Sequence, residues 1–160
     1  MACGFSIKEE EKLKQFRKKI SGLAAKALDS SALIPKLKIE MELSFSLINL
    51  DLAQKINSLA PYGQNNPQPR FVSYNLRLDD IVIMGLDSQH IKLRLSAVDP
   101  ETQATQSFWA IAFGAAQNYK YFKTGDMVDL VYYLEINEFN GRREPQLKIV
   151  DIRMSEGSVV

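Results

Sequence analysis

The chain has 160 residues, of which 46% are apolar and 24% charged, and its net charge is +1. This composition is typical of a globular protein with one ordinary core and excludes a disordered or collagen-like chain. Cys3 is the only cysteine, which excludes a disulfide framework and indicates a reducing, cytoplasmic setting.

The distribution of charge limits the kind of nucleic-acid surface to expect. Residues 1–40 carry nine Lys and Arg against five Asp and Glu, whereas residues 41–160 carry eleven against fourteen. Tight binding of phosphates needs a stripe of basic residues, so any nucleic-acid-binding surface in residues 41–160 should be small and local. The sequence starts with no secretion signal, and no apolar run approaches the roughly 20 residues that span a bilayer, so we expect no membrane association.

Residues 7–27 are predicted to form an amphipathic helix. Ser6 and Glu9 have the spacing of a capping box, and Phe16, Ile20 and Leu23 follow at helical spacing. The lysines of this segment are most simply a solvated face.

Two short elements are predicted next. Residues 36–43, KLKIEMEL, alternate with period two, which predicts a strand with Leu37, Ile39 and Met41 on one face. Residues 48–60 predict a short helix that begins at the cap Asn49 or Asp51. Its apolar side would present Leu52, Ile56 and Leu59.

Residues 61–70, PYGQNNPQPR, predict a rigid, extended connector because prolines and turn residues disfavour both helix and interior strand. We expect a domain boundary here, with residues 1–60 before it and a second domain at residues 71–155. The positions expected to fix the angle of that second domain are Pro61, Gly63, Asn66, Pro67 and Pro69.

Five apolar, β-branched stretches follow, at residues 71–85, 90–98, 106–114, 127–136 and 145–154, separated by turn residues. Five short strands predict a small barrel. The polar insertion at residues 114–126 lies where the five-stranded OB fold carries its helix. The predicted fold class is mainly β with flanking α: an OB-fold barrel preceded by a helix, a strand and a short helix.

Three segments carry a resemblance to a known family. Residues 61–71, PYGQNNPQPRF, resemble the PFGxGNPxPxF connector of RecJ proteins, and residues 134–153, LEINEFNGRREPQLKIVDIR, resemble the NEWNGRRxxQLxxxDIR element of their OB domain. The opening MACGFSI is similar to the AAGF piece of the DHHA-type domain of this family. The chain departs from the pattern at Asn65, where a glycine is usual, and at Phe139, where a tryptophan is usual.

The resemblance implies the C-terminal region of a single-stranded-DNA-specific 5′–3′ exonuclease, a hydrolase of DNA repair and recombination. The catalytic domain, with its Asp-His-His motif and Mn²⁺ or Mg²⁺ ions, is expected upstream of these residues. The implied partners are single-stranded DNA, that catalytic domain and a single-strand-binding protein. Asn65 can take the left-handed backbone conformation of the glycine that it replaces.

Residue content argues against catalysis by this chain alone. Two-metal phosphodiester hydrolysis needs several carboxylates, usually with histidines, at one point, and His90 is the only histidine. The sequence also contains no phosphate-binding loop or nucleophile elbow. We expect no catalytic residue and no metal ligand here.

The strongest binding candidate is the predicted hairpin turn at Asn140-Gly141. It is expected to project Phe139, Arg142 and Arg143 together, so that a base stacks on the ring while the arginines bind phosphate. A second candidate is the basic aromatic patch Tyr119, Lys120, Tyr121 and Lys123.

Each candidate has a structural alternative. Phe139 could pack into a neighbouring domain while the arginines pair with Glu138 or Glu144, and the two tyrosines could belong to the core. Two functions therefore stay open: a non-catalytic module that binds and guides single-stranded DNA, and a docking module that contacts the catalytic domain or a single-strand-binding protein.

Overall fold

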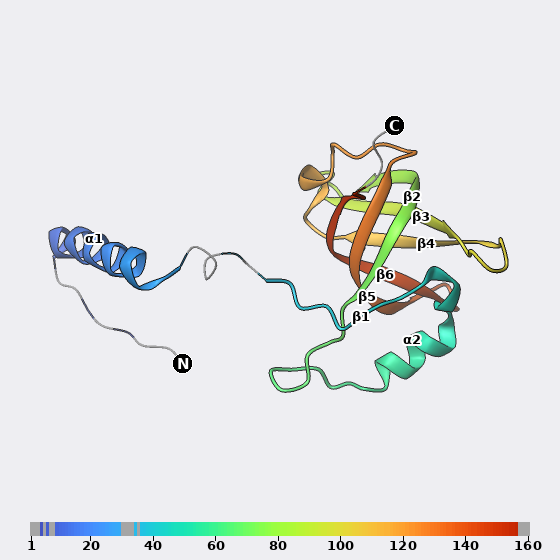
Figure 1. Ribbon diagram of the computed structural model, residues 1–160, viewed down its shortest axis with the longest axis horizontal. Helices are drawn as coiled ribbons and strands as arrows, with labels where there is room; N and C mark the ends of the chain where they lie inside the picture. The colour runs from blue at the N-terminus through green and yellow to red at the C-terminus, as the bar shows by residue number, and fades with distance from the viewer. Residues whose placement is uncertain (1–3, 5, 7–8, 30–33, 35, 157–160) are drawn as a thin grey trace. The chain divides into compact units, whose positions relative to one another are not determined.

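The computed structural model describes residues 4, 6, 9–29, 34 and 36–156. The chain divides into two compact units, Met1–Leu37 and Lys38–Val160, which are described separately (Figure 1). The division into residues 1–60, 61–70 and 71–155 that follows from the sequence pattern stays a prediction about the domains of a longer protein.

In the first unit, the described residues include helix α1 at Glu10–Ala27. Glu10 and Glu11 in its first turn and Lys26 in its last suit the helix dipole. The predicted capping box is not formed, because Glu9 is the N-cap and makes no side-chain cap bond. The Glu9 carboxylate instead accepts a hydrogen bond from Lys12 Nζ at 2.7 Å. No residue of α1 is buried.

The second unit is built around a closed five-stranded barrel. Its strands are β2 (Phe71–Met84), β3 (His90–Val98), β4 (Thr105–Ala112), β5 (Met127–Phe139) and β6 (Arg142–Met154). They are joined in the order β2-β3-β4-β6-β5, and β5 pairs back to β2. The β4–β6 pair is parallel and the other barrel pairs are antiparallel. The predicted OB-fold class is confirmed.

Strand β2 closes the barrel because it bends. It pairs with β5 through residues 71–77 and with β3 through residues 77–84. The register shifts between Ser73 and Leu76 and again between Leu78 and Asp80, and Asn75 in the first shift has a left-handed backbone with φ of 52°. Bulges of this kind increase strand twist and bending, which lets one strand serve two partners.

Alternating side chains of all five strands fill the barrel. The buried core includes Leu76, Leu78, Ile91, Leu93, Leu95, Ala110, Leu130, Tyr132 and Leu147. Tyr132 is the polar member of this set, and its hydroxyl lies 3.0 Å from Ser73 Oγ. Ser73 Oγ donates to the carbonyl of Leu43. Burial raises the pKa of Tyr132, which keeps the phenol protonated inside the barrel.

The predicted strand at residues 36–43 is largely wrong. Only β1, Met41–Glu42, is a strand, and it pairs in parallel with Phe71–Val72. Leu37, Ile39 and Met41, which were expected on one face of this strand, are 40%, 37% and 55% exposed. The alternation is present in the sequence, but its three apolar residues remain exposed in the structure.

Two helical segments follow β1: the 3-10 helix η2 at Phe45–Leu47 and helix α2 at Leu50–Asn57. The predicted cap is confirmed, since Asn49 Oδ1 accepts from the Leu52 amide at 2.8 Å. Ala53 and Ile56 are buried where α2 packs against β5 and β6, at one end of the barrel (Figure 1). Leu59 is 58% exposed, contrary to expectation, because the helix ends at Asn57.

The connector at residues 61–70 is irregular but well hydrogen-bonded. Asn66 Nδ2 donates to the carbonyls of Leu59 and Pro61, at 2.9 and 3.1 Å. Gly63 and Asn66 exchange backbone hydrogen bonds, which makes a tight turn. Neither Gly63 nor Asn65 has a positive φ, so this turn does not use the left-handed conformation that Asn65 could take.

Further along the connector, Pro67 is exposed and Pro69 is half-buried.

Between β4 and β5 the insertion forms only the 3-10 turn η3, Ala116–Asn118. None of the described helices is long and apolar enough to cross a membrane.

Candidate nucleic-acid interface

The β5–β6 hairpin forms as the sequence predicts. Asn140 and Gly141 both have left-handed backbones, with φ of 51° and 74°. Two consecutive left-handed residues match the twist of the flanking strands, which is why Asn-Gly is favoured in such turns. Phe139 and Arg142 are therefore the last paired residues before the tip.

The hairpin separates the three side chains that were expected to lie together. Phe139 is paired with Arg142, and Glu138 with Arg143. Successive residues of a strand point to opposite faces, so Phe139 and Arg142 share one face while Arg143 shares the other with Glu138. Arg143 Nε lies 3.6 Å from Glu138 Oε2. The expectation of one cluster of an aromatic ring and two arginines is wrong for Arg143.

The face with Phe139 and Arg142 is open. The Phe139 side chain is 69% exposed. Arg142 is exposed and, within the described part of the chain, has neither an ion pair nor a side-chain hydrogen bond. This hairpin face thus presents a stacking ring beside an unneutralised guanidinium.

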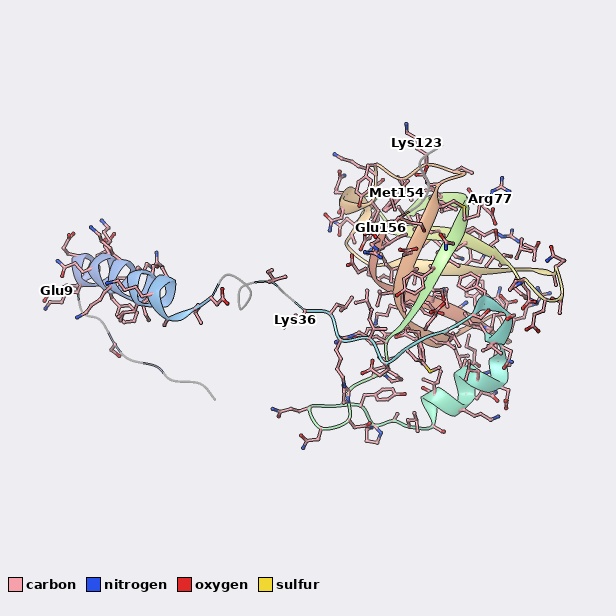
Figure 2. The ribbon with its side chains drawn as sticks, in the orientation of Figure 1. Glu9, Lys36, Arg77, Lys123, Met154 and Glu156 are labelled. Atoms are coloured by element: carbon pink, nitrogen blue, oxygen red, sulfur yellow. The ribbon has the colours of Figure 1, made fainter. Side chains whose placement is uncertain are left out.

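The second predicted patch lies at the other end of β5, beyond Met127. Figure 2 shows Lys123 at the end of the barrel opposite α2. Tyr119 is half-buried, and this burial raises the pKa of its phenol. Tyr121 is 60% exposed and its ring centroid lies 4.4 Å from that of Phe122, a buried core residue.

Lys120 and Lys123 are both exposed beside Tyr121. The lysines and Tyr121 form a small basic aromatic patch, whereas Tyr119 packs toward the core. Because this patch and the hairpin tip lie at opposite ends of β5, the two predicted sites do not form one cluster.

A third basic aromatic surface, which the sequence did not single out, lies on the outer face of β3 and β4. Trp109 on β4 is directly opposite Arg94 on β3. Lys92 Nζ lies 4.5 Å from the centroid of the Trp109 ring, and Arg94 Cζ lies 5.9 Å from it. Arg94 Nη2 also donates to Ser107 Oγ at 3.3 Å. We call Lys92, Arg94 and Trp109 the β3–β4 face.

The β3–β4 face holds its cations without carboxylate partners. Among the described residues, no salt bridge involves Lys92 or Arg94. A cation above an indole ring is attracted by about 0.5–1 kcal/mol at an exposed site and keeps its charge for other ligands. The cations are therefore oriented but not neutralised.

A shallow hollow connects this face to the hairpin. Its volume is about 210 Å³, and Trp109, Phe108 and Ser107 line it together with Glu144 and Pro145 of β6. The parallel pairing of Ala110 with Leu147 brings these strands together. The β3–β4 face and the start of the hairpin are thus neighbouring parts of one surface.

One signal for this surface was present in the sequence. In HIKLRLS the apolar residues Ile91, Leu93 and Leu95 alternate with Lys92 and Arg94, which predicts that both cations point outward. Trp109 lies in the continuous apolar run SFWAIA, where alternation does not reveal which residues face outward. In the structure Trp109 is half-buried.

No group of three or more His, Cys, Asp or Glu side chains that could hold a metal ion occurs among the described residues.

The barrel topology and its outer surface define the class of protein: an OB-fold domain. The family model described as the RecJ OB domain matches residues 39–151. The chain therefore belongs to the RecJ family.

Curated relatives agree with this assignment. The single-stranded-DNA-specific exonuclease RecJ of Haemophilus influenzae is 33% identical over 149 residues, which cover 93% of this chain and 25% of the relative. The RecJ of Bacillus subtilis is 25% identical over 156 residues, which cover 98% of this chain and 19% of that relative. The chain thus spans a quarter or less of the length of these relatives.

Among solved structures, RecJ of Thermus thermophilus in complex with Mn²⁺ is similar to this chain with a TM-score of 0.64. The match covers 92% of this chain and 20% of the solved chain, at 19% sequence identity. At this identity the similarity supports the fold alone.

Proposed function

We propose that this chain is the non-catalytic OB-fold part of a RecJ-like single-stranded-DNA-specific 5′–3′ exonuclease, and that it binds and guides single-stranded DNA for a catalytic domain elsewhere in the protein. Its role would belong to DNA repair and recombination. Mn²⁺ or Mg²⁺ would act in that catalytic domain.

One observation supports the proposal most directly: Lys92 and Arg94 are held over the Trp109 ring with their charges free. OB folds commonly bind oligonucleotides on the face of their second and third strands and on the loop between the fourth and fifth. Those elements correspond to β3, β4 and the β5–β6 hairpin. The free cations suit phosphates, and Phe139 suits an unstacked base.

In this proposal Trp109 positions the cations. With Lys92 4.5 Å from the centroid of its ring, that ring face is covered by the ammonium group. A base could stack there only by displacing the lysine. We therefore assign phosphate contacts to Lys92, Arg94 and Arg142, and base stacking to Phe139.

The test is a titration of the full chain against a fluorescein-labelled single strand of roughly 20 nucleotides, with fluorescence anisotropy as the readout, from about 25 to 200 mM NaCl. Three phosphate contacts predict a slope of log K against log salt of about −2, since each contact on a single strand contributes about −0.7. A duplex of the same sequence should bind more weakly.

The second candidate, a docking module, is favoured by the charge of residues 41–160, where acidic residues outnumber basic ones by fourteen to eleven. Absence of binding to the single strand even at the lowest salt would reject DNA guidance by this chain and leave docking. The partner in that case would be the catalytic domain or a single-strand-binding protein.

A further inference from the structure

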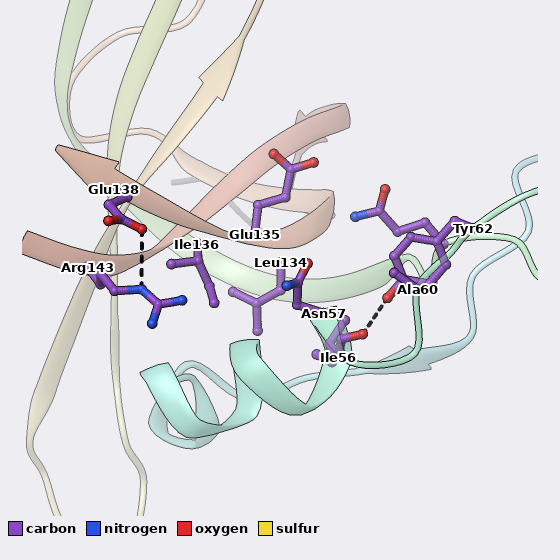
Figure 3. Close-up of a pocket in the computed structure, with 10 residues that line it drawn as sticks. Ile56, Asn57, Ala60, Tyr62, Leu134, Glu135, Ile136, Glu138 and Arg143 are labelled. Atoms are coloured by element: carbon purple, nitrogen blue, oxygen red, sulfur yellow. Dashed lines mark hydrogen bonds and ion pairs between the residues drawn. The ribbon is translucent and has the colours of Figure 1, made fainter.

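A separate pocket of about 430 Å³ lies between the end of α2, the connector and the base of the β5–β6 hairpin (Figure 3). Its floor is apolar and consists of Ile56, Leu134 and Ile136. Figure 3 shows Leu134 and Ile136 pointing toward α2, while Glu135 between them points away. The pocket is thus on the hairpin face opposite Phe139 and Arg142.

Two amide side chains, Asn57 and Gln68, are part of the pocket wall. Among the described residues, neither side-chain amide has a hydrogen-bond partner. Each amide can donate and accept at once. The wall therefore offers a ligand two free groups that complement an edge bearing both donors and acceptors.

The aromatic part of the wall is fixed in place. Tyr62 lines the pocket, and its hydroxyl donates to the carbonyl of Ile56 at the end of α2 (Figure 3). This hydrogen bond fixes the orientation of the Tyr62 ring. A planar ligand loses less freedom when it stacks on a ring that is already ordered.

The charges of the pocket limit its ligand. Three charged side chains line it: Arg143, Glu138 and Glu135. The Arg143 guanidinium is paired with Glu138 at 3.6 Å, and Glu135 is paired with Lys148 Nζ at 3.5 Å. A small free anion would find no unpaired cation there, and a purely apolar side chain would bury the free amides of Asn57 and Gln68 without partners. A flat ring with polar edges, such as a nucleobase, needs no unpaired cation and offers hydrogen-bond partners to both amides. The pocket volume is within the range of about 300–1,000 Å³ that is common for small-molecule sites.

We propose that this pocket takes one unstacked base of a bound single strand, with Asn57 and Gln68 binding its edge and Tyr62 contacting its plane. The inference rests on the proposed function. The turn Asn140-Gly141 is short, so a DNA strand that contacts Arg142 at the tip is one residue from Arg143, which lies on the hairpin face that carries the pocket. The pocket would supply base preference, whereas the outer surface binds phosphates of any sequence.

The experiment compares strands with and without bases. The full chain is titrated with labelled single strands of roughly 12 nucleotides: oligo-dA, oligo-dC, oligo-dT and a strand of abasic tetrahydrofuran units. The variant N57A/Q68A should lose about tenfold in affinity for the preferred base-bearing strand, as expected for one lost amide–base recognition. Its affinity for the abasic strand and its salt slope should not change.

A matched control removes the same residue types nearby. The variant Q64A/N65A changes two exposed residues of the connector turn that do not line the pocket, and it should bind every strand as the unmodified chain does. Thermal unfolding of both variants reports whether either change disturbs the fold.

A second readout locates the base. In amide NMR spectra, oligonucleotides with bases should shift residues 56–62 and 134–136, and the abasic strand should not. Equal loss of affinity by N57A/Q68A for base-bearing and abasic strands would overturn the pocket and leave the proposed function standing. Absence of binding to every strand would reject the proposed function itself, and the pocket with it.

Discussion

The β3–β4 face and the tip of the β5–β6 hairpin carry the same chemical groups, an aromatic ring and cations, but hold them differently. On the face, Trp109 is half-buried in a paired strand and two cations lie over its ring. At the tip, Phe139 is 69% exposed and Arg142 has no described partner. The side chains of the β3–β4 face are therefore ordered before a ligand binds, whereas those of the hairpin tip are not.

This difference matters because ordering a long side chain on binding costs about 0.5–1.5 kcal/mol. Lys92 and Arg94 have lost part of that freedom already through their contacts with Trp109 and Ser107. Arg142 and Phe139 would lose it only when a strand binds. We therefore expect the β3–β4 face to contribute more to single-strand affinity than the tip, although the sequence indicated the tip as the strongest candidate.

The largest expected effect comes from removing both cations of the β3–β4 face, in the variant K92A/R94A. Two lost phosphate contacts at about 1 kcal/mol each predict a loss of about thirtyfold in single-strand affinity at about 50 mM NaCl. The salt slope should become shallower by about 1.4. Anisotropy titrations at several salt concentrations measure both quantities.

The matched comparison for this variant is K120A/K123A, which removes two exposed lysines at the other end of β5. We expect it to change affinity less than about threefold, because among the described residues no aromatic ring holds either ammonium group in place, and Tyr119 of that patch is half-buried. If K120A/K123A costs as much as K92A/R94A, the preference for the β3–β4 face is wrong.

A middle-sized effect is expected from Phe139→Ala. Loss of one stacked base at the low end of about 1–3 kcal/mol predicts about a fivefold loss of affinity with the salt slope unchanged, because no charge is removed. The melting temperature should stay the same, since the ring is largely exposed. Phe139→Trp should keep or improve binding. Wild-type affinity in the alanine variant would show that the ring does not contact the strand.

The contrast between strands β1 and β3 explains how much of the fold was predictable. In β3 the alternating Ile91, Leu93 and Leu95 are all buried. The same alternation at Leu37, Ile39 and Met41 gives exposed side chains and a strand of only two residues. A period of two says which residues share a face, but only the tertiary structure decides whether another layer covers that face.

The candidate site was predictable in part for a similar reason. The Asn-Gly turn is local, so its position and left-handed geometry follow from two residues. The separation of Arg142 from Arg143 also follows from strand alternation, once the hairpin is known to remain paired up to Phe139. The position of Lys92 and Arg94 over Trp109 depends on the β3–β4 register, which no local pattern in the run SFWAIA determines.

The smallest expected effect comes from single variants of two neighbouring arginines, which lie on opposite faces of the hairpin. Arg142→Ala removes a free cation, so affinity should fall about threefold and the salt slope should become shallower by about 0.7. Arg143→Ala removes a cation that Glu138 already neutralises at 3.6 Å, so affinity for the abasic strand should change less than about twofold. Equal losses in the two variants, measured side by side by anisotropy, would mean that the bound hairpin presents both guanidiniums to the same strand.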